Sequence, residues 1–150
     1  MAHSYVRNYI HLIYSTKNRE RYLRPDIRKR LWDYTNGIIR NLKSDPIAVD
    51  GYEEHCHILF QLHPTLALSK AVQTIKANTS KWLSDTYPEL YSFSWQEGYG
   101  AFSVSSSQIS KIVEYIQNQE EHHKRMSFQE EYLAFLKANN IEYDERYVLG

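Results

Sequence analysis

The sequence predicts an α+β fold of the ferredoxin-like or RRM-like kind, a βαββαβ antiparallel sheet followed by additional C-terminal helices. Segments rich in β-branched and aromatic residues, as strands are, lie at 5–15, 47–51, 55–62 and 93–104. Two segments with apolar residues at helical spacing separate them, at 25–42 and 68–83. We find no internal repeat, low-complexity stretch or Gly/Ser linker, so we expect one domain over 1–150.

The first strand and helix follow directly from local signals. YVRNYIHLIYS at 5–15 has the composition of a strand. Pro25 suits the first turn of a helix, because its missing N–H needs no partner there. Apolar side chains at helical spacing then continue to about residue 42, at Ile27, Leu31, Tyr34 and Ile38.

The middle of the chain predicts two strands and a second helix. Ile47–Gly51 and His55–Leu62 are short apolar runs joined by a tight turn, which indicates a hairpin. The segment Leu68–Leu83 is amphipathic, with one face formed by Leu68, Val72, Ile75, Thr79 and Trp82.

The last third predicts a broken strand and two helices. Gly98 and Gly100 interrupt the strand expected at 93–104. A helix is expected from about Gln108 to His123, and a shorter one begins at Ser127 and ends at Ala138. The remaining tail is expected to be extended or loose.

The composition excludes several classes of protein. A single cysteine excludes an intrachain disulfide framework. Hydrophobic residues make up 42%, too many for a disordered chain, and no apolar run has the roughly 20 residues of a membrane span. MAHSYVRNYIHL lacks the pattern of a signal peptide, so we expect a cytoplasmic protein.

The charges are unevenly distributed although the formal net charge is zero. Residues 1–81 hold 13 Lys and Arg against 7 Asp and Glu, whereas residues 82–150 hold 5 against 11. The basic half predicts a surface that can attract phosphate groups. A solvated helix face is the alternative. The residues that we predict to contact these phosphates, those of DNA in the function proposed below, are Lys17, Arg19, Arg21 and Arg28.

The segment EEHCHILF at 53–60 carries two histidines one residue apart. Alternate residues of a strand share a face, so His55 and His57 project together and Cys56 points to the opposite face, into the core. We expect the imidazoles to face solvent, where they could bind one metal ion. Surface strands also carry such pairs by chance.

The segment VEYIQNQ at 113–119 contributes a hydroxyl and an amide. Tyr115 and Gln119 are four residues apart, so they are neighbours on one flank of the predicted helix. Taken alone, this segment is more typical of a helix with a half-buried tyrosine and a solvated glutamine.

Together the two segments suggest phosphodiester chemistry. His55, His57 and Gln119 would supply three neutral ligands to Mg²⁺ or Mn²⁺ and leave positions for phosphate oxygens. Tyr115 would be the nucleophile of a covalent phosphotyrosine, and strands could be rejoined without ATP.

The chain resembles the single-strand tyrosine transposases of bacterial insertion sequences, the IS200-like family of the HUH endonuclease superfamily. The motifs that carry the resemblance are HLIYSTKNRERYL (11–23), EHCHILF (54–60), LSKAVQTIKANTSKWL (68–83), FSWQEGYGAFSVS (93–105) and VEYIQNQEEHHK (113–124). The resemblance implies that His55, His57 and Gln119 are metal ligands and that Tyr115 is the nucleophile. Cys56 departs from the family pattern, which usually has a branched apolar residue there.

The resemblance also implies the substrate and the assembly. It implies DNA transposition on single strands with hairpin-bearing ends, by a homodimer in which the tyrosine helix commonly serves the partner's metal site. Two alternatives stay open: a domesticated protein that binds hairpin DNA or RNA without transposing it, and a rolling-circle nicking initiator. We assign no function to His11, expect His122 and His123 to be solvated, and favour a solvated turn for Glu54.

Overall fold

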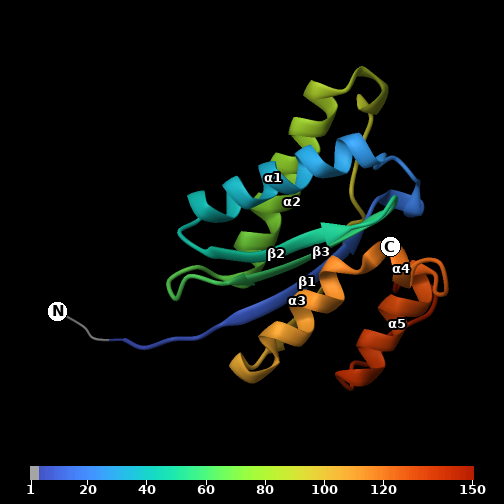
Figure 1. Cartoon of the computed structure of the whole chain (residues 1–150). Helices are drawn as coiled ribbons and strands as arrows, with labels where there is room; N and C mark the ends of the chain where they lie inside the picture. The colour runs from blue at the N-terminus through green and yellow to red at the C-terminus, as the bar shows by residue number, and fades with distance from the viewer. Residues whose placement is uncertain (1–3) are drawn as a thin grey trace.

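The computed structural model describes residues 4–150 and contains a four-stranded antiparallel sheet (Figure 1). Its strand order is β2-β3-β1-β4. The strands are β1 (Tyr9–Ser15), β2 (Asp45–Gly51), β3 (His55–Gln61) and β4 (Gly100–Val104). This order and the intervening helices confirm the predicted βαββαβ sheet.

Helices cover both faces of the sheet (Figure 1). The first face carries α1 (Pro25–Asn41) and α2 (Leu68–Thr86), and the main apolar core lies between these helices and the sheet. The C-terminal helices α3 (Ile109–Gln117), α4 (Gln119–His122) and α5 (Phe128–Ala138) cover the second face. The predicted additional helices are therefore a third layer of the molecule.

The pleat of β3 sorts its side chains between the two layers of helices. Cys56, Ile58 and Phe60 belong to the core beneath α1 and α2. His55 and His57 lie on the other face, opposite Ser15 and Ile13 of β1, below the C-terminal helices. The sorting predicted for the histidines and Cys56 is thus confirmed.

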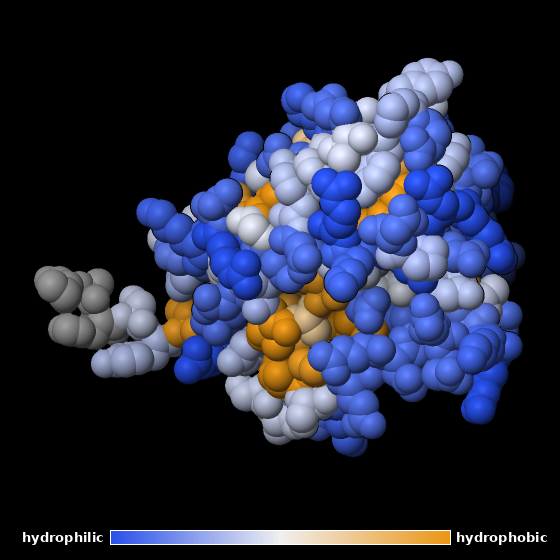
Figure 2. All heavy atoms as spheres, turned by 45° about the horizontal axis from the view of Figure 1, so that its top comes forward, coloured by the Kyte–Doolittle hydropathy of each residue, from blue (hydrophilic) through white to orange (hydrophobic). Residues whose placement is uncertain are grey.

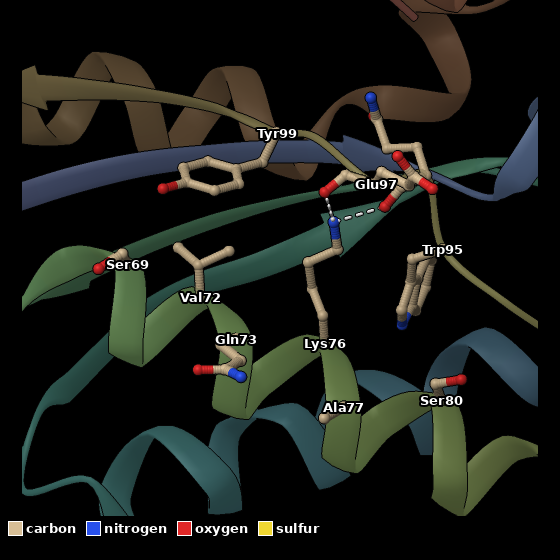
Figure 3. Close-up of a pocket in the computed structure, with 10 residues that line it drawn as sticks. Ser69, Val72, Gln73, Lys76, Ala77, Ser80, Trp95, Glu97 and Tyr99 are labelled. Carbon is tan, nitrogen blue, oxygen red and sulfur yellow. Dashed lines mark hydrogen bonds between the residues drawn. The ribbon is translucent and has the colours of Figure 1, made fainter. Parts of the chain in front are cut away.

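The strand predicted at 93–104 is shorter in the structure, where only Gly100–Val104 is regular. Residues before it turn their carbonyl groups toward α2. Lys76 Nζ donates to the carbonyls of Gln96 and Glu97 at 2.6 and 3.3 Å (Figure 3), and to that of Gly98 at 2.8 Å. Trp95 keeps a single bridge to Thr16. These carbonyls are bound to an ammonium group, so they do not form a strand ladder with β1. The first strand likewise begins at Tyr9 rather than Tyr5.

The helix predicted at 108–123 is interrupted at Asn118, whose φ of −108° and ψ of 27° are not helical. The interruption separates α3 from the short α4. It turns the first residue of α4, Gln119, toward the sheet, where only 1% of its surface is exposed.

Figure 2 shows one face of the molecule, on which hydrophilic residues predominate and hydrophobic residues gather in a patch below the centre and in smaller areas elsewhere. Within residues 4–150, we find no helix that combines the length and the apolar character needed to cross a membrane.

Candidate active site

The two histidines of β3 lie in an enclosed space between the sheet and the C-terminal helices. Neither His55 nor His57 is exposed at all, and their ring centroids are 5.2 Å apart. Phe128 and Phe135 of α5 pack against these rings at centroid distances of 4.6 and 6.3 Å. The expectation that the imidazoles face solvent is wrong, because α5 covers this part of the sheet.

Gln119 reaches the same space from the start of α4. Its Oε1 atom lies 2.9 Å from His55 Nε2. The structure therefore brings the three predicted metal ligands together. The alternative of a solvated glutamine is excluded by its burial.

Tyr115 approaches from α3 and is half-buried. Its ring lies 5.7 Å from that of His57 and 4.4 Å from that of His122, measured between centroids. Its hydroxyl donates a hydrogen bond to Glu131 Oε2. The predicted nucleophile is thus at the edge of the histidine pair, within one chain.

Glu131 of α5 occupies the centre of the site and was not identified from the sequence. It is 1% exposed. Its Oε1 atom lies 2.9 Å from His57 Nε2 and 3.4 Å from His55 Nε2. Glu131 follows Phe128 by three residues and precedes Phe135 by four, which places it on the apolar face of its helix. A lone carboxylate on such a face was the signal available in the sequence.

The outward-facing nitrogens of the histidine pair are also bound. His55 Nδ1 lies 2.6 Å from Glu54 Oε1, and His57 Nδ1 lies 2.9 Å from His11 Nε2. These contacts direct both Nε2 atoms toward Glu131, as second partners of metal-binding histidines do. The solvated turn favoured for Glu54 and the lack of a role for His11 are both corrected here.

His123 was expected in solvent, but its side chain is 4% exposed and belongs to the site. Its Nε2 atom lies 3.1 Å from Gln119 Oε1 and 3.4 Å from Glu131 Oε1. The interruption at Asn118 turns α4 inward and brings His123 with it. His122 packs against Tyr115, as given above, and is also not fully solvated.

The buried charges balance one another. Burial alone raises the pKa of the Glu131 carboxyl, but the imidazoles of His57, His123 and His55 outweigh it and hold that pKa well below its usual range. Burial likewise lowers the pKa of His55, yet its hydrogen bonds with Glu131 and Glu54 raise it to about 9. The site thus contains a carboxylate stabilised by positive charge.

The pKa of Tyr115 is raised well above its usual value, mainly by burial and to a lesser extent by the adjacent Glu131 carboxylate. The hydroxyl is therefore a neutral hydrogen-bond donor in this state. Attack by this oxygen requires additional positive charge nearby.

The donor atoms fit a hard divalent cation. One ligand atom from each of His55, His57 and Glu131 can be chosen so that all three lie within 4.8 Å of one another. The amide oxygen of Gln119 adjoins this group through its contact with His55. Imidazole nitrogens combined with carboxylate and amide oxygens suit Mn²⁺ and, through the oxygens, Mg²⁺.

The four basic residues predicted to bind DNA have different environments. Lys17 is exposed, and the Arg21 side chain is 72% exposed although it pairs with Glu53 at 3.1 Å. Arg19 donates to the Leu149 carbonyl oxygen at 3.2 Å and remains partly exposed.

Arg28 differs from the open basic face that we expected. It is 7% exposed and donates to the Leu23 carbonyl oxygen at 2.8 Å and to Glu120 at 3.3 Å. Its guanidinium also lies 5.3 Å from the centroid of the Tyr52 ring. These contacts give Arg28 a structural role, because they leave little of its guanidinium group accessible to a phosphate.

Comparison with known proteins gives one family. The family model described as "Transposase IS200 like" matches residues 4–119, which include the histidine pair and Tyr115. The ISDra2 transposase TnpA of Deinococcus radiodurans is 25% identical over 114 residues, covering 73% of this chain and 81% of that protein.

Two solved structures share the fold. A transposase structure from Deinococcus radiodurans R1 has a TM-score of 0.63 and 22% identity, covering 79% of this chain and 96% of that one. A REP-associated tyrosine transposase bound to a REP hairpin has a TM-score of 0.61 and 17% identity, and the match covers 82% of this chain and 73% of that one.

Proposed function

The chain belongs to the IS200-like transposase family, and from that premise we propose that it cleaves and rejoins single-stranded DNA at hairpin-bearing transposon ends through a 5′-phosphotyrosine intermediate. One observation carries the proposal. The Tyr115 hydroxyl is hydrogen-bonded to Glu131, whose other oxygen contacts the Nε2 atoms of His55 and His57 in the enclosed space that Gln119 Oε1 also enters. A nucleophile next to such a group is the arrangement that phosphoryl transfer requires.

The proposed roles follow from the donor atoms. The Nε2 atoms of His55 and His57 and the amide oxygen of Gln119 would hold Mg²⁺ or Mn²⁺. Such an ion, when bound, polarises a phosphodiester and offsets its charge. Glu54 and His11 hold the two imidazoles in the required orientation through their Nδ1 atoms.

Tyr115 then supplies the covalent step. Its hydroxyl oxygen forms a bond to phosphorus while the bond from phosphorus to the 3′ oxygen breaks, and the tyrosine proton ends on the released 3′ hydroxyl. The 5′ phosphate remains on Tyr115. A 3′ hydroxyl from another strand reverses the same exchange, so rejoining needs no ATP.

We propose single-stranded hairpin DNA as the partner. Support comes from the family and from the solved relative that binds a REP hairpin. The exposed Lys17 and Arg21, together with the partly exposed Arg19, are the proposed phosphate contacts. We further propose that the protein is cytoplasmic, and that it is a homodimer, as the family resemblance implies.

Covalent capture tests this function. The substrate is a labelled single strand carrying the palindromes that flank the gene, and a denaturing gel should show a protein–DNA adduct in Mn²⁺ but none in EDTA. Tyr115→Phe should abolish the adduct. Tyr147→Phe, at an exposed tyrosine, is the matched control. An adduct that persists in Tyr115→Phe would place the nucleophile elsewhere.

A further inference from the structure

We propose that Glu131 is an anionic metal ligand, so that the divalent cation is held by His55 and His57 of β3 and by a carboxylate that α5 contributes. This inference rests on the proposed function, because it adds a ligand to the same metal site. It concerns a residue beyond the segment that the family model matches, which ends at residue 119.

The geometry of the carboxylate supports a ligand. The Oε1 atom of Glu131 lies 2.9 Å from the Nε2 atom of His57 and 3.4 Å from that of His55, and all three residues are buried. The Nδ1 atoms of both histidines are already bound by other side chains. The Nε2 atoms of the two histidines therefore remain available to a cation, and they point toward the same position as Glu131 Oε1.

The charge of the site supports the same assignment. A buried carboxylate is costly unless it is paired or coordinates a metal. The three ligands predicted from the sequence are neutral, so a divalent cation bound by them alone keeps its full charge in a space from which water is largely excluded. Glu131 adds one negative charge there, and hard cations such as Mg²⁺ and Mn²⁺ prefer carboxylate oxygen.

The second oxygen of Glu131 connects the ion to the nucleophile. Oε2 accepts the hydrogen bond from Tyr115, while Oε1 faces the histidines. A cation bound at Oε1 would therefore be separated from the Tyr115 hydroxyl by a single carboxylate. Gln119 Nε2, at 3.4 Å from Oε2, helps to fix the orientation of the carboxylate.

The position of Glu131 is fixed by packing rather than by a loop. A capping box between Ser127 and Glu130 begins α5, with Glu130 N donating to Ser127 Oγ at 3.1 Å. Phe128 and Tyr132, on either side of Glu131, are each 3% exposed. The carboxylate is thus delivered by an anchored helix, as a preorganised ligand should be.

Mn²⁺ titration of the purified protein, followed by the electron paramagnetic resonance of the free ion, tests the assignment. Glu131→Gln keeps the shape of the side chain and removes its charge. We expect at least a tenfold loss of Mn²⁺ affinity, because even groups that only orient a ligand contribute 10- to 100-fold. Glu130→Gln is the matched control, since it removes the neighbouring exposed carboxylate and glutamine still completes a capping box. Equal affinity in wild type and Glu131→Gln overturns the inference.

A second measurement needs no variant and so does not depend on how Glu131→Gln folds. Fe²⁺ bound in place of Mn²⁺, with ascorbate and hydrogen peroxide, cleaves backbone close to the ion. We expect fragments that end near residues 55–57 and also near residue 131. Cleavage near 55–57 without cleavage near 131 overturns the inference.

Failure of the inference can be told from failure of the proposed function. If Mn²⁺ affinity falls in His57→Ala but is unchanged in Glu131→Gln, Glu131 is not a ligand and the proposed function stands. If Mn²⁺ binding depends on Glu131 but no covalent adduct forms on Tyr115 with the flanking DNA, the ligand stands and the cleavage proposal fails.

Discussion

His11 Nε2 lies 2.9 Å from His57 Nδ1, across the β1–β3 pair of the sheet. Both rings are buried, and burial lowers the pKa of each, so both are neutral imidazoles near pH 7. In this structure His57 Nε2 faces the Glu131 carboxylate and donates to it, so His57 Nδ1 accepts from His11 Nε2. If His57 Nε2 were to bind a cation, Nδ1 would instead carry the ring proton and donate a hydrogen bond to His11 Nε2, and His11 would then stabilise that tautomer.

We predict that His11→Phe lowers Mn²⁺ affinity by about 10- to 100-fold, the usual cost of losing such a partner. Phenylalanine fills the space of the imidazole but accepts no hydrogen bond. His63→Phe, at a loop histidine whose Nδ1 lies 2.8 Å from Thr65 Oγ1, is the control. Isothermal titration compares the variants, and unchanged affinity in His11→Phe would show that His57 needs no such partner.

We predict that the Cys56 thiol is unreactive in the native protein. Burial raises its pKa to about 12, whereas a thiol in the unfolded chain has a pKa of about 8.5. At pH 8 the thiolate population is lower in the folded protein by roughly a thousandfold, and the thiolate is the reactive species. Ellman's reagent should therefore label Cys56 quickly in denaturant and very slowly without it. Rapid labelling of the native protein would contradict the side of β3 assigned to Cys56.

The raised pKa of Cys56 also contributes to the pH dependence of the free energy of unfolding. The folded state favours the protonated thiol, so this contribution is complete below the unfolded pKa and is lost as the pH rises above it, toward about 12. We expect a slope of about 1.4 kcal/mol per pH unit from this group between those two values. Urea unfolding from pH 8 to pH 10 measures it, with Cys56→Ala as the control lacking the group.

Local residue spacing was enough to predict part of the site. Because alternate residues of a strand share a face, the sequence predicted that His55 and His57 lie together. Because residues four apart on a helix are neighbours, it predicted that Tyr115 and Gln119 lie on one flank of their helix. The contacts between these two groups span 64 residues, and the segments were joined by their combined donor chemistry and by the family resemblance rather than by local spacing. Their functional roles stay predictions.

Glu131, His11 and His123 were missed because their importance comes from long-range packing. Glu131 is 74 residues from His57, and His11 is 46 residues from it. His123 enters the site only because α4 turns at Asn118. The prediction that the histidine pair faces solvent was wrong for the same reason. Strand alternation tells which face of the sheet a residue lies on, but not which helix covers that face.

We predict that Lys17, Arg19 and Arg21 determine the salt dependence of DNA binding. Each neutralised phosphate on a single strand contributes a slope of about −0.7 in log K against log salt. Changing Arg19 and Arg21 to alanine should flatten the slope by roughly 1 to 1.5 and weaken binding to all sequences similarly. Fluorescence anisotropy of a labelled hairpin over a salt series measures the slope. An unchanged slope would place the DNA path elsewhere.

Arg28→Ala provides the contrast. Its guanidinium is committed to Leu23 and Glu120, so its loss should destabilise the fold by about 1–3 kcal/mol, the usual cost of leaving a buried polar group unpaired. The salt slope should stay that of the wild type. Urea unfolding and anisotropy on the same preparation separate the two effects, and a flattened slope with unchanged stability would restore Arg28 as a DNA contact.

We predict that Tyr115 acts on the metal site of its own chain. Ile116, the next residue of α3, is fully buried against Leu59 and Ala48 of the same sheet, and this packing holds the Tyr115 hydroxyl on Glu131. Moving α3 to a partner requires the loss of that packing. A site completed by a partner's tyrosine would need the equivalent contacts to form between chains.

Complementation between two inactive variants decides this. Tyr115→Phe and His57→Ala proteins are co-expressed with different tags, and mixed dimers are isolated through both tags. If the tyrosine serves its own chain, no chain holds both working groups and the mixed dimer forms no adduct. If it serves the partner, one composite site pairs an intact Tyr115 with an intact His57, and an adduct returns on the His57→Ala chain. We expect no adduct, and its return would refute the arrangement within one chain while leaving Tyr115 as the nucleophile.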